Sequence, residues 1–181
     1  IPIPFSMVGY RELTGQITIM PAYWWMYNRY ALERNAWKFR KRDTRVVISQ
    51  HIETDYIAPD TIEEIEMAMK LLSLWVGQAA LASNLIAPGV GSSDTALTEQ
   101  GRILLETHPE QVGTLVVLAQ GIERSATPAQ ILKAAEGYRA YREMLVFGCM
   151  SILINYCREQ GCTVFEFQRQ VSETLKEDRQ L

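Results

Sequence analysis

The sequence contains few of the residues that mark disulfide scaffolds and metal clusters. Its 181 residues include three cysteines and two histidines, and no two cysteines stand in C-x-x-C spacing. This excludes the usual zinc and dithiol redox motifs, so we expect Cys149, Cys157 and Cys162 to be reduced thiols of a cytoplasmic protein. Neither sign of charge predominates, because 18 basic residues stand against 21 acidic ones. With 48% hydrophobic residues, the composition excludes a disordered or collagen-like chain.

Long hydrophobic runs are also missing. The most apolar stretch extends from Met144 to Cys157, between Arg142 and Arg158. A helix that crosses a bilayer needs about 20 apolar residues, and this stretch is shorter. We therefore expect a core helix here and no membrane partner.

The chain begins at Ile1, with neither a methionine nor the charged segment that opens a signal peptide. We expect one domain over residues 1–181, cut from the C-terminal part of a longer cytoplasmic protein. Residues 1–19 would lead into it. Residues 84–93, which are rich in glycine, proline and serine, would form an internal linker.

Apolar residues recur at spacings of three and four over most of the chain, which is typical of amphipathic helices. Capping-box patterns begin two of these helices, at Asp60 with Glu63 and at Thr163 with Glu166. The expected helices cover residues 20–43, 60–83, 94–108, 127–160 and 163–178. Ser93 or Asp94 would cap the third, Thr127 would cap the fourth with Pro128 in its first turn, and Gly161 would end the fourth. The predicted fold is mostly α, a multi-helix bundle with at most a minor β element.

Two segments do not follow the helical pattern. Residues 45–57 alternate apolar and polar side chains, which favours a short strand or an extended segment. Residues 110–122 fit either a strand or a buried helical turn, and we favour the helix.

The first candidate site is the row His51-x-Glu53-x-Asp55. On a strand all three side chains project from one face, with neighbours about 7 Å apart. Such a row could act in acid–base catalysis or bind a divalent metal. The alternative is the exposed polar face of a half-buried strand. The sequence identifies neither a cofactor nor a metal for this site.

The second candidate site lies in the first predicted helix and combines amide with cationic side chains: Asn28, Arg29, Arg34, Asn35 and Lys38. Residues 1–45 contain eight basic and three acidic residues, and the remainder contains ten and eighteen. Amides beside guanidinium groups can bind phosphate, carboxylate or sugar hydroxyls. The alternative is that the polar groups pair with acidic residues elsewhere and that two adjacent aromatic rows bury the helix on more than one side. Nucleic acid is not an expected partner, because the basic run is short and the chain is acidic overall.

Three stretches of the sequence resemble the C-terminal half of an uncharacterised bacterial family of long chains. They are Leu13–Asn28, Tyr30–Lys38 and His51–Thr61. The N-terminal part of that family resembles a left-handed β-helix of the hexapeptide-repeat kind found in sugar-nucleotide and acyl transferases. The resemblance implies a C-terminal helical region whose partners are the N-terminal part of the parent chain and, since such β-helices commonly form trimers, further copies. This chain has no hexapeptide repeats itself.

Three hypotheses for function follow. The first is an accessory or assembly module that presents its basic aromatic helix to an anionic small molecule such as a sugar phosphate. The second is an enzyme domain that uses His51, Glu53 and Asp55, and the third is a purely structural bundle. No diagnostic catalytic motif decides between them.

Overall fold

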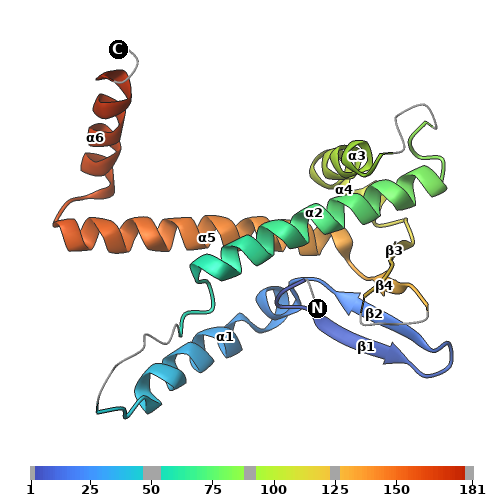
Figure 1. Ribbon diagram of the computed structural model, residues 1–181, viewed down its shortest axis with the longest axis horizontal. Coiled ribbons are helices and arrows are strands. Elements are labelled where there is room, and N and C mark those ends of the chain that lie inside the picture. Colours follow the sequence, from blue (N-terminus) through green and yellow to red (C-terminus); the bar gives the residue numbers. More distant parts are fainter. Residues whose placement is uncertain (1–2, 47–53, 88–92, 123–126, 178–181) are drawn as a thin grey trace. The chain divides into compact units, whose positions relative to one another are not determined.

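The computed structural model describes residues 3–46, 54–87, 93–122 and 127–177. The chain divides into two compact units, Ile1–Met144 and Leu145–Leu181. The first unit contains a four-stranded sheet and most of the helices, and the second contains the end of one helix and the whole of the last (Figure 1). Among the described residues the fold is mostly helical, as predicted.

The helices are α1 (Tyr23–Arg42), α2 (Pro59–Ala82), α3 (Asp94–Thr107), α4 (Pro109–Val112), α5 (Ala134–Gln160) and α6 (Val164–Glu177). The sequence pattern predicted five of these six. The short α4 lies at the start of residues 110–122, where we favoured a helix, and it begins at a proline because proline fits the first helical turn.

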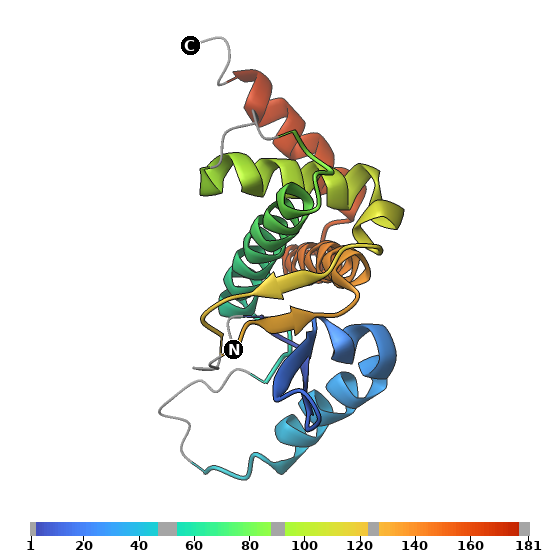
Figure 2. The ribbon, with the colours of Figure 1, turned by 90° about the vertical axis from the view of Figure 1, so that its right-hand side faces the viewer.

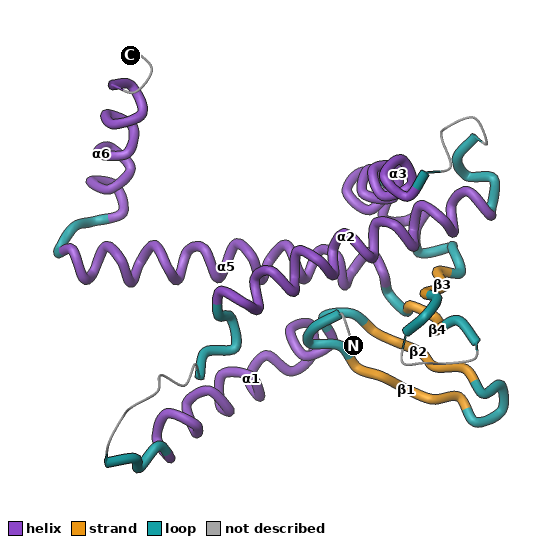
Figure 3. Tube along the Cα trace, in the orientation of Figure 1, coloured by secondary structure: helices purple, strands orange, loops and turns teal. Residues whose placement is uncertain are grey.

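The sheet is built from segments that are far apart in the chain. Its strands are β1 (Met7–Arg11), β2 (Gln16–Met20), β3 (Val117–Ala119) and β4 (Ala129–Ile131), in the order β1-β2-β4-β3 (Figure 3). β1 and β2 form an antiparallel hairpin, so residues 7–20 are a sheet element and more than a lead-in to the first helix. β2 then pairs with β4 in parallel and β4 with β3 antiparallel.

Two helical predictions are wrong because tertiary pairing takes the segments into the sheet. Thr127 and Pro128 were expected to open a helix, yet the next residues form β4, and α5 begins only at Ala134. In residues 110–122, where we favoured a helix over a strand, α4 is followed by β3. Ala129 and Ile131 are buried and Gln130 is half-buried, so β4 has the period of two expected of a strand with one covered face.

α2 is the central helix of the first unit. Among the described residues it is the one helix long and apolar enough to cross a membrane by length and composition alone. It packs against α3 and β3 (Figure 2), and Ile65, Leu72 and Val76 are fully buried. Its apolar composition is thus explained by its place in the core. Ala58 precedes Pro59 at its N-terminus without a side-chain cap, so the capping box predicted at Asp60 and Glu63 is absent.

The capping predictions for α3 and α6 are confirmed. The Ser93 hydroxyl accepts a hydrogen bond from the Ala96 N–H at 3.3 Å. In the second unit the Thr163 N–H donates to Glu166 at 2.8 Å, and the Glu166 N–H donates to the Thr163 hydroxyl at 3.2 Å. These are the two reciprocal bonds of a capping box, and they define where α6 starts.

Candidate functional site

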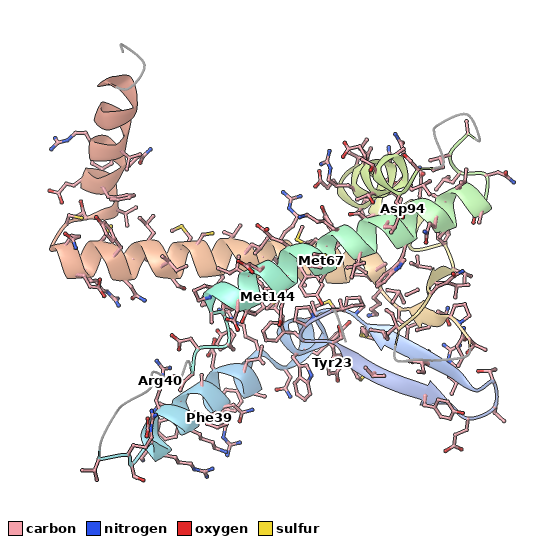
Figure 4. The ribbon with its side chains drawn as sticks, viewed as in Figure 1. Tyr23, Phe39, Arg40, Met67, Asp94 and Met144 are labelled. Atoms are coloured by element: carbon pink, nitrogen blue, oxygen red, sulfur yellow. The ribbon has the colours of Figure 1, made fainter. Side chains whose placement is uncertain are left out.

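α1 is the helix with the least burial in the first unit. Of its residues only Trp25 and Ala36 are buried. α1 and the β1–β2 hairpin extend in opposite directions from their junction (Figure 1). The labelled Phe39 and Arg40 lie on the second half of α1 (Figure 4). The alternative, in which two aromatic rows bury the helix on more than one side, is wrong for the second half of α1, because Tyr30, Trp37 and Phe39 are 72%, 54% and 68% exposed.

The helix is kinked at Asn28, which has φ −146° and ψ 42° inside an otherwise helical segment. The turn before the kink belongs to the core. Ala22, with a left-handed φ of 51°, is fully buried there, and its N–H donates to the hydroxyl of Tyr141 at 3.3 Å. The kink therefore separates an anchored first turn from the exposed second half of α1.

Arg29 lies just after the kink and is used for internal packing. Its Nε donates to Glu33 Oε1 at 3.2 Å, and its guanidinium lies 4.3 Å from the centre of the Trp25 ring. Trp25 also contacts Tyr56, whose pKa is raised, first by burial and then by the charge of Glu33. Arg29 thus helps to hold α1 against the segment that follows it.

A row of cationic and aromatic side chains follows one side of the second half of α1. We call it the basic aromatic stripe: Tyr30, Arg34, Trp37, Lys38 and Lys41. Four of these residues are spaced i, i+4, i+7 and i+11, which places them on one helical face, and Lys38 lies beside them. The Lys41 ammonium group is 5.0 Å from the centre of the Trp37 ring.

The cations of the stripe differ from Arg29 in their surroundings. Within the described part of the chain, Arg34 and Lys38 form no ion pair. Arg34 is exposed and Lys38 half-buried. Since they are one turn apart, their like charges create a local positive field that no described carboxylate neutralises.

The five residues of the predicted anion site are therefore distributed over α1. Arg34 and Lys38 share the stripe, whereas Asn35 is exposed about a quarter-turn away. Asn28 marks the kink, and Arg29 faces Trp25. Sequence reasoning placed Tyr30 and Trp37 in one aromatic row, but it took that row as buried and did not join Arg34 and Lys41 to it. The spacing i, i+4, i+7, i+11 of Tyr30, Arg34, Trp37 and Lys41 was the available signal.

Of the row His51, Glu53 and Asp55, the structure describes only Asp55, because His51 and Glu53 lie outside the described residues. Most of the predicted strand of residues 45–57 also lies outside them. Asp55 is exposed, and its Oδ1 is 3.5 Å from a guanidinium nitrogen of Arg40. No group of three or more metal-ligating side chains occurs in the described ranges. A catalytic or metal-binding role for the row stays a prediction.

No protein-family model matches the sequence, and no solved structure matches it. An uncharacterized protein of Treponema pallidum (strain Nichols) is 37% identical to the chain over 175 residues. The match covers 97% of this chain but only 23% of that relative. The chain is thus similar, over almost its whole length, to one part of a much longer protein.

Proposed function

We propose that the chain is an accessory module of a larger bacterial protein and that its basic aromatic stripe binds a phosphate-bearing small molecule, such as a sugar phosphate, in the cytoplasm. One observation carries the proposal. Arg34 and Lys38 have no ion-pair partner among the described residues, and they lie beside the exposed rings of Tyr30 and Trp37 on the same helical face.

The chemistry of the stripe suits such a ligand. A guanidinium group presents a planar fork of donors that matches two phosphate oxygens, and an ammonium group adds a point charge beside it. Aromatic rings can stack on the apolar face of a sugar, and Trp37 already contacts the cation of Lys41. Cations and rings on one face therefore favour a ligand that has both a phosphate and a ring.

The module interpretation rests on the length of the relative and on the family resemblance. A protein similar to this chain over 23% of its own length has room for other functions. The resemblance to a family with a hexapeptide-repeat N-terminal part supports a parent protein that handles sugar nucleotides or acyl groups. In such a protein the module would hold an anionic substrate or product close to the remainder of the chain.

Tryptophan fluorescence provides a direct test, because Trp37 belongs to the stripe. We expect glucose 1-phosphate, at low ionic strength, to change the emission saturably, and glucose to leave it unchanged. The double variant Arg34→Ala, Lys38→Ala should weaken the binding at least about tenfold, since it removes two charge-assisted contacts. Added salt should weaken binding in the native chain.

The control variant is Arg102→Ala on α3, which removes an exposed cation that is paired with Glu99 and Glu106. This variant should bind as the native chain does. An absence of saturable change at low ionic strength, or an equal response from the double variant, would refute the stripe as a phosphate site.

A further inference from the structure

The end of α5 brings two cysteines together. Gly161 follows the helix with a left-handed φ of 64°, and its N–H donates to the carbonyl of Arg158 at 3.2 Å. The N–H of Cys162 donates to the carbonyl of Cys157 at 2.9 Å. These two bonds form a Schellman motif, in which the side chains of the residues equivalent to Cys157 and Cys162 normally touch.

The surroundings of the two thiols differ. Cys157 is 4% exposed, whereas Cys162 is half-exposed at the start of the turn into α6. Burial, followed by the neighbouring thiol of Cys162, raises the pKa of Cys157. Cys149 is exposed on α5, two turns before Cys157. Solvent therefore reaches Cys162 more easily than Cys157. The Cys157 thiol is the neighbour of the Cys162 thiol on its buried side.

We propose that Cys157 and Cys162 form a reversible disulfide when the protein meets an oxidised low-molecular-weight thiol, so that the junction of α5 and α6 is a site of redox modification. The Schellman backbone already holds the two residues in hydrogen-bonded proximity, which is the requirement that most cysteine pairs fail. Disulfides in cytoplasmic proteins are generally of this transient kind.

The reaction proceeds in two exchange steps. The Cys162 thiolate attacks one sulfur of a small disulfide, such as glutathione disulfide, and one glutathione leaves as its thiolate. The Cys157 thiol loses its proton to water, and its sulfur attacks the Cys162 sulfur of the mixed disulfide, which releases the second glutathione. The protein loses two electrons and two protons, and the small disulfide becomes two thiols.

The bond would connect the last turn of α5 to the residue before the capping box of α6. Thr163, directly after Cys162, forms both reciprocal bonds with Glu166. In the second unit Tyr156 and Phe167 also meet across this junction, with ring centres 5.4 Å apart. Oxidation would therefore restrict the turn between the two helices while leaving their hydrogen bonds in place.

The test uses the full chain, reduced and then incubated with glutathione disulfide. We expect its peptide map to contain a Cys157–Cys162 cross-link, and we expect the mass of the oxidised Cys149→Ser chain, which lacks the separate exposed thiol, to fall by two hydrogens. After unfolding in denaturant, alkylation should label all three cysteines of the reduced chain, and neither Cys157 nor Cys162 of the oxidised chain. Treatment with excess dithiothreitol should restore the labelling of all three.

Variants separate the steps of the reaction. Cys149→Ser is the matched control and should form the cross-link as the native chain does. Cys157→Ser should stop at a stable glutathione adduct on Cys162. If the native chain and Cys149→Ser give only glutathione adducts or intermolecular disulfides, with no internal cross-link in the map, the proposal is wrong, whether or not Cys157→Ser folds.

Discussion

At the scale of single residues, Tyr141 connects three parts of the first unit. Its side chain is fully buried on α5. The hydroxyl donates to the carbonyl of Pro4 at 2.5 Å and accepts from the N–H of Ala22, the left-handed residue before α1. One phenol thus satisfies two backbone groups that surround the start of the exposed helix.

The substitution Tyr141→Phe should lower the free energy of unfolding by about 1–3 kcal/mol, because it leaves those buried backbone groups without their partner. Burial also raises the pKa of Tyr141. Since the unfolded tyrosine then ionises at a lower pH than the folded one, this group favours folding fully below about pH 10 and progressively less above it. Urea titrations between pH 7 and 11 should show that the free energy of unfolding falls less with rising pH in the variant than in the native chain.

The control for this prediction is Tyr10→Phe, which changes a tyrosine that is 66% exposed on β1. It should leave both the stability and its pH dependence nearly unchanged. If Tyr141→Phe and Tyr10→Phe behave alike, the hydroxyl of Tyr141 does not have the role assigned to it.

Residue-scale predictions from sequence were reliable where the signal is local. Ser93, Thr163, Glu166 and Gly161 occupy the capping positions that the sequence indicates. Asp60 does not, because Pro59 itself starts α2 and places Asp60 within its first turn. A proline that is suited to the first helical position competed with a carboxylate that is suited to the cap.

At the scale of elements, the closest packing is that of α2 against α3. A Cβ atom added to Gly101 would lie 1.8 Å from the carbonyl oxygen of Ser73, and one added to Gly77 would lie 2.0 Å from that of Leu97. The obstructing atoms belong to the backbone, so no side chain can move aside. The two glycines let the helices approach more closely than alanine would permit.

We expect Gly101→Ala to destabilise the protein by about 1–3 kcal/mol, the usual cost of overpacking a core. A loss of stability would be informative, since in an exposed helix interior alanine is favoured over glycine by about 1 kcal/mol and the same substitution would stabilise the protein. Thr95→Ala, at an exposed position of α3, is the control and should be neutral or slightly stabilising. Thermal unfolding of the two variants beside the native chain measures the difference. A stabilised Gly101→Ala would contradict the close approach.

The strand β4 shows why some elements could not be predicted. Thr127, Pro128 and Gln130 satisfy the local pattern of a helix start, and a strand of three residues is too short for its period of two to be recognised in the sequence. The choice is made by β2, since Ile131 pairs with Ile19, more than a hundred residues earlier in the chain. A contact at this distance leaves no local signature.

At the scale of the whole molecule, the two units differ in how much apolar surface they bury. The first unit has a core around α2 and Tyr141. In the second unit Val146, Ile152 and Phe165 are 64%, 55% and 77% exposed. Fewer buried contacts mean a lower free energy of local opening.

Amide hydrogen exchange should detect this difference. We expect amides in residues 145–177 to exchange roughly 100-fold faster than those in the centre of α2, equivalent to about 2.7 kcal/mol. Amides at the centre of α3 serve as the reference for the first unit. Equal protection in both units would contradict the prediction. If the protection of residues 145–177 were then lost on dilution, a second copy of the chain would be what covers their apolar side chains.

The sequence alone determined the helical character, most helix boundaries and three of five cap predictions, because capping groups and amphipathic spacing act within a few residues of the chain. It also drew attention to α1 as the basic helix. Only the tertiary structure decided that Tyr30, Trp37 and Phe39 of α1 are exposed, that residues 129–131 form a strand, and that Gly137 packs closely on Pro21. Each of these three features depends on which distant segment of the chain covers a given face of a helix or strand. A covered face and an exposed face can have the same spacing of residues, so the sequence pattern does not distinguish them.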